Sequence, residues 1–179
     1  MKRLFVMDLK NYDENWVRSA RPSVRGIIDC GDQFALIHNT KYNYYAFPGG
    51  GLDEGESNEE ALIREVLEEN GLTVVPESIK SFCSALIIRK SFVFENTIFE
   101  QENLYYYCTA DKNIGETKLE SYEIEDGLKL EFMSLEKAIE HNRSIDPKSV
   151  RNGDADWIDR ETRIMEEFLC QRYTQEQTS

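Results

Sequence analysis

The arrangement of apolar and polar positions divides the chain into short strand-like runs and three helical stretches. Strands are predicted where apolar residues alternate with polar ones or form short runs, and helices where apolar residues recur every three or four positions. Glycine and proline mark the turns between these elements. We expect helices between 57 and 71, from 134 to 141 and over 157–169, and strands at 24–29, 33–38, 44–47, 79–89, 104–108 and 128–132.

Strands interleaved with helices predict an α/β class. The 179 residues are enough for one domain with a proper core and too few for two. We expect this domain over 22–170, a connector at 92–99, an acidic loop at 112–127 and a disordered polar tail at 171–179. Residues 1–21 form a lead-in segment, either a strand at 4–9 followed by irregular backbone or a segment that packs against a partner subunit.

The helix between 57 and 71 has clear start and stop signals. Ser57 and Glu60 are spaced as a capping box, in which each side chain satisfies a free amide at the helix start. Gly71 stands where a left-handed residue would end the helix. The apolar residues between these signals predict that most of this helix is buried in the domain.

Three glutamates lie on one face of this predicted helix. Glu65, Glu68 and Glu69 have the spacing i, i+3, i+4, and like charges at that spacing repel by roughly 0.2–0.5 kcal/mol per pair. The C-terminal end of the helix dipole also disfavours anions. A solvated acidic face is the ordinary explanation of such a run. That explanation does not account for Glu56, Arg64 and the glycines at 49–51, whereas a Mg²⁺ site would use the carboxylate oxygens.

The segment from 50 to 72 resembles the Nudix box. The box runs Gly, five residues, Glu, seven residues, Arg-Glu, an aliphatic residue, any residue, Glu-Glu, any residue, Gly and an aliphatic residue. A match at nine fixed positions is highly specific. These positions are filled here by Gly50, Glu56, Arg64, Glu65, Val66, Glu68, Glu69, Gly71 and Leu72.

The resemblance implies an α/β/α sandwich with a mixed β-sheet and a hydrolase that uses Mg²⁺ or Mn²⁺. Such enzymes cleave nucleoside diphosphates linked to another group. By resemblance, Glu68 and Glu69 are the leading catalytic metal ligands, and Glu65 is a further ligand or the general base. Glu56 would support a second ion or orient the ligands of the first.

Gly50 and Gly51 are expected to bind the substrate, and Arg64 is expected to support that binding indirectly. Gly50 and Gly51 follow a strand and let the backbone approach phosphate oxygens closely. Arg64 is expected to pair with a box carboxylate and fix its rotamer rather than to touch the substrate, a role suited to a bidentate cation.

Residues outside the box are less sharply indicated. Glu100, Glu102, Glu123 and Glu125 are candidates for the general base, although a solvated position is the ordinary alternative for each. His38 and His141 are expected to be ordinary surface or edge residues rather than catalytic ones. Rings that could stack on a base, with core packing as the default, are Tyr44, Tyr45, Phe47, Tyr105, Tyr106 and Tyr107, and arginines that could meet phosphates are Arg18, Arg21, Arg25 and Arg89.

The composition argues against some classes of binding partner and suggests a cellular compartment. The chain has 34 acidic and 21 basic residues and a net charge of −13, which argues against a nucleic-acid backbone or an anionic membrane as the main partner. The four cysteines lack zinc-site spacing and suggest reduced thiols in a cytoplasmic protein. The N-terminus lacks the apolar stretch of a signal peptide, and no run is long enough to span a membrane.

Three functions remain open at this point. The favoured one is a metal-dependent pyrophosphohydrolase acting on a small nucleotide, either an ADP-ribose-like compound or a nucleoside triphosphate. The second is a sensor domain of the same family that binds a nucleotide without turnover; such domains tend to lose box carboxylates, and this sequence has lost none. The third is a structural acidic domain. A homodimer is also expected as an option, because members of the family often pair.

Overall fold

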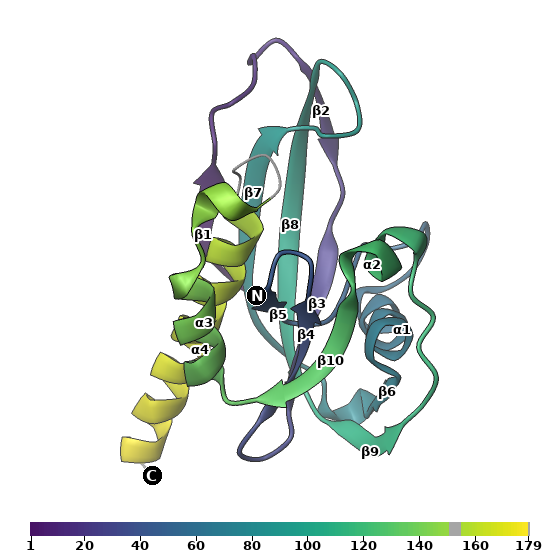
Figure 1. Cartoon of the computed structure of the whole chain (residues 1–179), viewed down its shortest axis with the longest axis vertical. Helices are drawn as coiled ribbons and strands as arrows, with labels where there is room; N and C mark the ends of the chain where they lie inside the picture. The colour runs from purple at the N-terminus through teal and green to yellow at the C-terminus, as the bar shows by residue number, and fades with distance from the viewer. Residues whose placement is uncertain (151–154, 179) are drawn as a thin grey trace.

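A computed structural model describes residues 1–150 and 155–178. An eight-stranded mixed sheet lies between α1 on one face and the pair α3 and α4 on the other, as Figure 1 shows. The α/β/α sandwich expected from the sequence is therefore confirmed. The helices are α1 (Asn58–Asn70), α2 (Ser121–Asp126), α3 (Leu135–Ser144) and α4 (Asp156–Thr178), with short 3₁₀ turns η1 (Pro76–Ser78) and η2 (Pro147–Ser149).

The main sheet has the order β1-β7-β8-β3-β4-β10, with β2 added to the edge of β8 and β5 to the edge of β4. The pairs β1–β7, β2–β8 and β3–β8 are parallel, and the other pairs of this sheet are antiparallel. A small second sheet joins β6 to β9. The strands are β1 (Lys2–Asp8), β2 (Val17–Ala20), β3 (Ser23–Asp29), β4 (Phe34–Asn39), β5 (Tyr44–Ala46), β6 (Leu72–Val74), β7 (Lys80–Lys90), β8 (Thr97–Cys108), β9 (Ala110–Ile114) and β10 (Leu128–Met133).

Alternation along β3 gives the protein its two hydrophobic layers. Val24 and Ile28 pack with Leu62 and Val66 of α1, while Ile27 joins the cluster formed with α3 and α4. Successive strand residues point to opposite faces, so one short strand contributes to both layers. Gly26 belongs to the α1 side, because a Cβ placed there would lie 3.3 Å from Val66 Cγ2.

The central strands β3 and β4 diverge after a short contact. They pair only through Ile28 with Ala35 and Asp29 with Phe34. Beyond this point the chain segment that follows β5 lies beside β3: Gly26 N donates to Pro48 O at 2.8 Å and Val24 N to Gly50 O at 2.9 Å. The opening between the two strands is therefore filled by the turn that leads into α1.

Several sequence expectations need correction. Of the two alternatives for residues 1–21, the strand is present as β1 in this chain's own sheet, but β2 lies where irregular backbone was expected. The connector at 92–99 belongs in part to β8, which begins at Thr97. The expected loop at 112–127 contains the end of β9 and all of α2. The tail expected to be disordered continues α4 as far as Thr178, while residue 179 lies outside the described residues. None of the described helices is long and apolar enough to cross a membrane.

Candidate active site

The helix that carries the box glutamates begins and ends as its sequence predicts. Ser57 and Glu60 form both hydrogen bonds of the capping box. Gly71 ends the helix with φ +67°, and its N–H donates to Leu67 O at 2.8 Å. The adjoining side of α1 is held on the sheet by Ala61, Leu62 and Val66. The glutamate face is thereby directed towards the turn beside β3.

The turn from Phe47 to Gly51 is held by hydrogen bonds to β3 and to α1. In addition to the two hydrogen bonds from β3, Gly49 N donates to Glu69 Oε2 at 2.6 Å. Gly49 has φ +136°, and a Cβ at this position would lie 2.1 Å from Val24 O. The Glu65 carboxylate lies against Gly50, where a Cβ would be 2.3 Å from its Oε2. Glycine is therefore required at 49, where the clash is with backbone, whereas at 50 a larger residue would displace the Glu65 carboxylate.

We predict that Gly49→Ala lowers the free energy of unfolding more than Gly55→Ala. Gly55 also has a positive φ, +82°, but a Cβ there would meet nothing within 4 Å. The comparison isolates the clash with Val24 O, which should add about 1–3 kcal/mol, the usual cost of forcing atoms into a packed site. Urea unfolding of both variants measures the difference. Equal losses would show that the turn can move away from β3 without cost.

Arg64 connects most of the box carboxylates. Its Nε donates to Glu56 Oε1 and its Nη2 to Glu56 Oε2, both at 2.8 Å, and Nη1 donates to Glu65 Oε1 at 2.8 Å and to Glu68 Oε2 at 3.3 Å. Nη2 also donates to Gly51 O at 3.1 Å. The hydrogen bonds from Arg64 lower the pKa of the Glu56 carboxyl to about 2. The pairing of Arg64 with box carboxylates, expected from the sequence, is present.

The box glutamates differ in their surroundings. Glu69 is buried, and this burial raises the pKa of its carboxyl to about 8. Burial also raises the pKa of Glu65, while the hydrogen bond from Arg64 opposes the shift. Glu68 is the most exposed of the three, with 38% of its side chain accessible. Desolvation of this kind disfavours the charged form, and a bound cation would reverse it.

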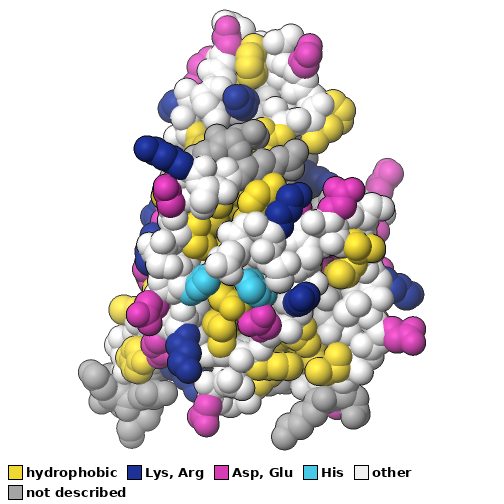
Figure 2. All heavy atoms as spheres, viewed as in Figure 1, with side chains coloured by type: hydrophobic (Ala, Val, Ile, Leu, Met, Phe, Trp, Pro, Cys, Tyr) yellow, Lys and Arg dark blue, Asp and Glu magenta, His cyan; other side chains and the backbone are white. Residues whose placement is uncertain are grey.

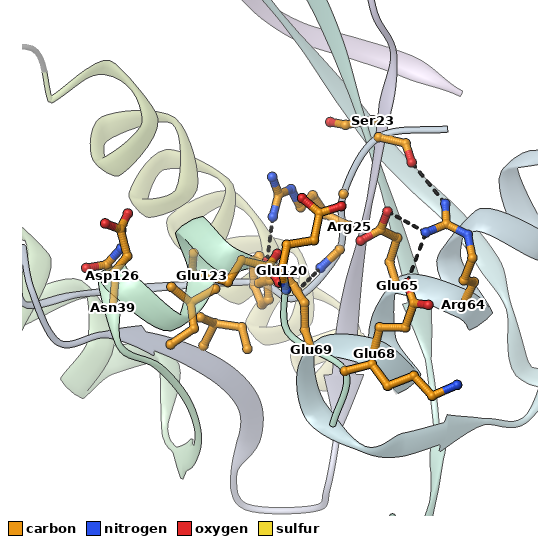
Figure 3. Close-up of a pocket in the computed structure, with 18 of the residues that line it drawn as sticks. Ser23, Arg25, Asn39, Arg64, Glu65, Glu68, Glu69, Glu120, Glu123 and Asp126 are labelled. Atoms are coloured by element: carbon orange, nitrogen blue, oxygen red, sulfur yellow. Dashed lines mark hydrogen bonds and ion pairs between the residues drawn. The ribbon is translucent and has the colours of Figure 1, made fainter. Parts of the chain in front are cut away.

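A cavity of about 360 Å³ opens in front of these glutamates. Glu65, Glu68 and Glu69 line one side, and the segment that includes α2 forms the opposite wall, as Figure 3 shows. Asn39 and Asp126 lie together at the end away from Arg64, and Asn39 Nδ2 donates to Asp126 Oδ2 at 3.4 Å. Further charged residues on the lining are Arg21, Arg25, Lys118, Glu120 and Glu123.

The cations of the cavity fall into two groups. Arg64 is neutralised by box glutamates, as described above. Among the described residues, Arg21, Arg25 and Lys118 form no ion pair, although Arg25 Nη1 donates to Phe47 O at 3.3 Å. The buried Nε of Arg25 has no hydrogen-bond partner in the described part of the chain. These three side chains can meet an anionic ligand without first breaking a salt bridge.

The donor set fits a hard divalent cation. Carboxylate oxygens from one helix, facing further carboxylates across a cavity that admits water, are the ligands that Mg²⁺ and Mn²⁺ prefer. Within 1–150 and 155–178, no three acidic, histidine or cysteine side chains are already arranged to hold a metal ion. Because Glu65 and Glu68 are bonded to Arg64, these two carboxylates must turn from it to share an ion, whereas Glu69 is bonded to Gly49 through Oε2 and can offer its other oxygen without leaving the turn.

Other sequence candidates lie elsewhere. Of the four glutamates considered as a general base, Glu123 alone lines the cavity. Glu100 pairs with Arg18, Glu102 pairs with Arg3, and Glu125 is exposed on α2. Sequence reasoning did not single out Lys118, Glu120, Asn39 or Asp126, which no box position marks.

The fold places two of the aromatic candidates on the cavity lining and both histidines outside it. Tyr44 and Phe47 line the cavity, whereas Tyr105 is completely buried in the core. Tyr45 stacks on His38 with ring centroids 4.6 Å apart and contacts His141 edge-on. Figure 2 shows the two histidines close together on one face of the molecule. Their contacts are structural and lie outside the cavity lining.

The chain resembles known proteins in sequence. The NUDIX domain family model matches residues 20–159. An RNA pyrophosphohydrolase of Sulfurovum sp. (strain NBC37-1) is 29% identical over 132 residues, which cover 67% of this chain and 81% of that protein. An RNA pyrophosphohydrolase of Photobacterium profundum is 44% identical over 55 residues, which cover 30% of this chain and 31% of that protein.

The solved structures that resemble this one share its fold. A MutT protein from Bacillus halodurans has a TM-score of 0.52 at 24% identity and covers 68% of this chain and 72% of its own. A NUDIX hydrolase from Nitrosomonas europaea has a TM-score of 0.50 at 19% identity, over 70% and 79% of the two chains. With a family match over most of its length, the complete box and the shared fold, this chain belongs to the Nudix family of hydrolases.

Proposed function

We propose that the protein is a Mg²⁺- or Mn²⁺-dependent pyrophosphohydrolase that cleaves the phosphoanhydride of a nucleoside diphosphate linked to another group. The observation that carries this proposal is the presence of two complementary sets of side chains in one cavity. Three box carboxylates line one side, and Arg21, Arg25 and Lys118 stand around them without ion pairs in the described part of the chain. The first set suits a divalent cation and the second suits phosphate oxygens.

The roles of the residues follow from this arrangement. Glu68, Glu69 and Glu65 hold the cation, which supplies charge neutralisation and lowers the pKa of water. Arg25 and Lys118 neutralise the phosphate oxygens, and the backbone at Gly50 and Gly51 lets them approach. Glu123 faces the carboxylates from the opposite wall and is the candidate outside the box for the general base. Glu56 is bonded through both oxygens to Arg64, so we assign it to orienting the ligands rather than to binding a second ion.

The end of the cavity near Asn39 is the place for the nucleoside. Tyr44 offers a ring, and Asn39 and Asp126 offer polar atoms, while Ile37 and Leu128 provide apolar surface. The cavity volume lies within the range of small-ligand sites. We therefore favour a free nucleotide, and the homodimer and cytoplasmic location expected from the sequence remain part of the proposal.

A second substrate class comes from the relatives. Two of them are named RNA pyrophosphohydrolases, so a triphosphate at the 5′ end of RNA is the alternative for this chain. The net charge of −13 disfavours extended contacts with a phosphate backbone but leaves the terminal phosphates of an RNA open.

The substrate class is tested by incubating the protein with Mg²⁺ and a panel of ADP-ribose, nucleoside triphosphates and 5′-triphosphorylated RNA, followed by quantification of the released phosphates. We expect cleavage of a small nucleotide at least about tenfold faster than of RNA, equivalent to about 1.4 kcal/mol in the transition state. Faster cleavage of RNA would move the assignment to the second class. Tight binding of a nucleotide without product would instead identify a sensor domain.

A further inference from the structure

The C-terminal helix places a charged pair inside the protein, next to the turn from Phe47 to Gly51. Glu161 of α4 is 1% exposed and Arg160 is 6% exposed. Arg160 donates to Glu161 Oε1 through Nε at 3.0 Å and Nη2 at 2.8 Å. The apolar residues Ile164, Met165 and Phe168 of the same helix already join it to the core. Burying a carboxylate is costly unless its oxygens are satisfied, so the remaining partners of Glu161 are informative.

The two oxygens of Glu161 serve different parts of the structure. Oε1 receives Arg160 and the hydroxyl of Tyr105, which donates at 2.6 Å. Oε2 receives one donor, the backbone N–H of Phe47, at 3.0 Å. Phe47 begins the turn that leads into the box, so this oxygen connects α4 directly to the active site.

The backbone of this turn also forms hydrogen bonds with two residues of the cavity, Arg25 and Glu69. The carbonyl of Phe47 accepts from Arg25 Nη1. Pro48 has no N–H, so the next amide along the chain is that of Gly49, which donates to Glu69 Oε2. The only two amides in the run 47–49 therefore bind Glu161 of α4 on one side and Glu69 of α1 on the other.

We propose that Glu161 is a positioning residue of the active site, which holds the turn from Phe47 to Gly49 so that Glu69 and Arg25 keep their places in the cavity. The inference rests on the proposed function for its catalytic meaning, although the positioning itself concerns a turn and a metal ligand. It assigns the last helix a part in the site, far in sequence from the box.

Glu161→Gln is a sharp test because glutamine has one acceptor oxygen where glutamate has two. The Oε1 side faces a cation and a hydroxyl, so the glutamine oxygen should turn there, which leaves its NH₂ against the N–H of Phe47. Tyr105→Phe is the matched control: it removes one hydrogen bond from the same carboxylate and leaves the bond to Phe47 in place.

Three measurements are made on the full chain: thermal stability, Mn²⁺ affinity by electron paramagnetic resonance, and amide hydrogen exchange across 44–51. We expect Glu161→Gln to weaken Mn²⁺ binding about tenfold or more, the usual effect of removing a partner that orients a ligand, and to speed exchange at Gly49. Tyr105→Phe should lower stability without changing either of the other two readouts.

The proposal is overturned if folded Glu161→Gln binds Mn²⁺ as the wild type does, or if Tyr105→Phe weakens it equally. Should Glu161→Gln fail to fold, exchange in the wild type decides, because an unprotected Phe47 amide would contradict the bond to Glu161. A wild type that binds Mn²⁺ but hydrolyses nothing would refute the proposed function and leave the positioning role standing.

Discussion

Glu69→Gln is expected to lower the rate of pyrophosphate-bond hydrolysis about 10³-fold while leaving the fold intact. Loss of a ligand weakens the cation that stabilises charge in the transition state, an effect of several kcal/mol, and about 4 kcal/mol corresponds to a factor of 10³. The fold should survive because glutamine has nearly the same shape and its oxygen can still accept from Gly49 N, the one hydrogen bond given by the turn to this side chain. Steady-state kinetics with Mg²⁺ and thermal unfolding measure the two effects.

The matched control is Glu59→Gln. Glu59 lies on the first turn of the same helix, is exposed and lies outside the cavity lining. This variant removes the same charge from α1 and should keep the wild-type rate. Loss of activity in both variants would indicate that the overall charge of α1, rather than a ligand position, controls the reaction.

The second large loss of activity is expected when Arg64, which bonds most of the box carboxylates, is replaced. Arg64→Lys removes a planar fork that bonds both oxygens of Glu56 and reaches Glu65, Glu68 and Gly51. One ammonium cannot replace these bonds, so we predict a loss of kcat/KM of about 10- to 100-fold. Because Glu56 is proposed to act through Arg64, Glu56→Gln combined with Arg64→Lys should cost little more than Arg64→Lys alone.

A similar Arg–Glu pair outside the cavity lining provides the control. Arg143 bonds both oxygens of Glu166 through Nε at 3.0 Å and Nη2 at 2.9 Å, between α3 and α4. Arg143→Lys should therefore leave kcat/KM unchanged. If Glu56→Gln and Arg64→Lys instead lower kcat/KM by independent factors that multiply, Glu56 has a role of its own, such as holding a second ion.

The sequence was sufficient for the box helix because its signals are local. Ser57 with Glu60 starts α1 and Gly71 ends it, and the spacing of Glu65, Glu68 and Glu69 places these side chains on one face whatever surrounds them. The nine-position match to the Nudix box then predicted the α/β/α sandwich by resemblance to the family. Pairing of Arg64 with Glu68 could also be foreseen, because residues four apart on a helix are neighbours, whereas its bonds to Glu56, which precedes the helix, do not follow from helical spacing.

The opposite wall of the cavity depends on contacts that no local pattern encodes. The same limit applies outside the cavity lining to the strand β2, which has four residues and pairs with β8, about eighty positions away. The helix α2 has six residues in an acidic segment with turn-like glycines, so its composition resembled a loop. Lys118 is placed by its N–H, which donates to Glu68 O at 2.8 Å at the end of α1. Such a position follows from tertiary structure rather than from residue type.

Glu161 is a further residue whose role could not be predicted from the sequence. An apolar stripe with helical spacing correctly indicated that the last helix packs on the core, as Ile164 and Met165 do. Glu161 lies within that stripe, three and four residues before Ile164 and Met165, but a charged residue has solvent exposure as its ordinary interpretation. Only the fold reveals that Tyr105 and the N–H of Phe47 lie where they can donate to the buried carboxylate.

The central claim is that the box carboxylates hold the divalent cation on which hydrolysis depends. The most direct measurement is the rate of phosphate release from the best substrate of the panel, by protein stripped with a chelator and then titrated with Mg²⁺. We predict no turnover in the stripped wild type, saturable recovery as Mg²⁺ is added, and no recovery in Glu69→Gln at the same concentrations. Turnover that survives removal of the metal, or that returns equally in Glu69→Gln, would contradict this account.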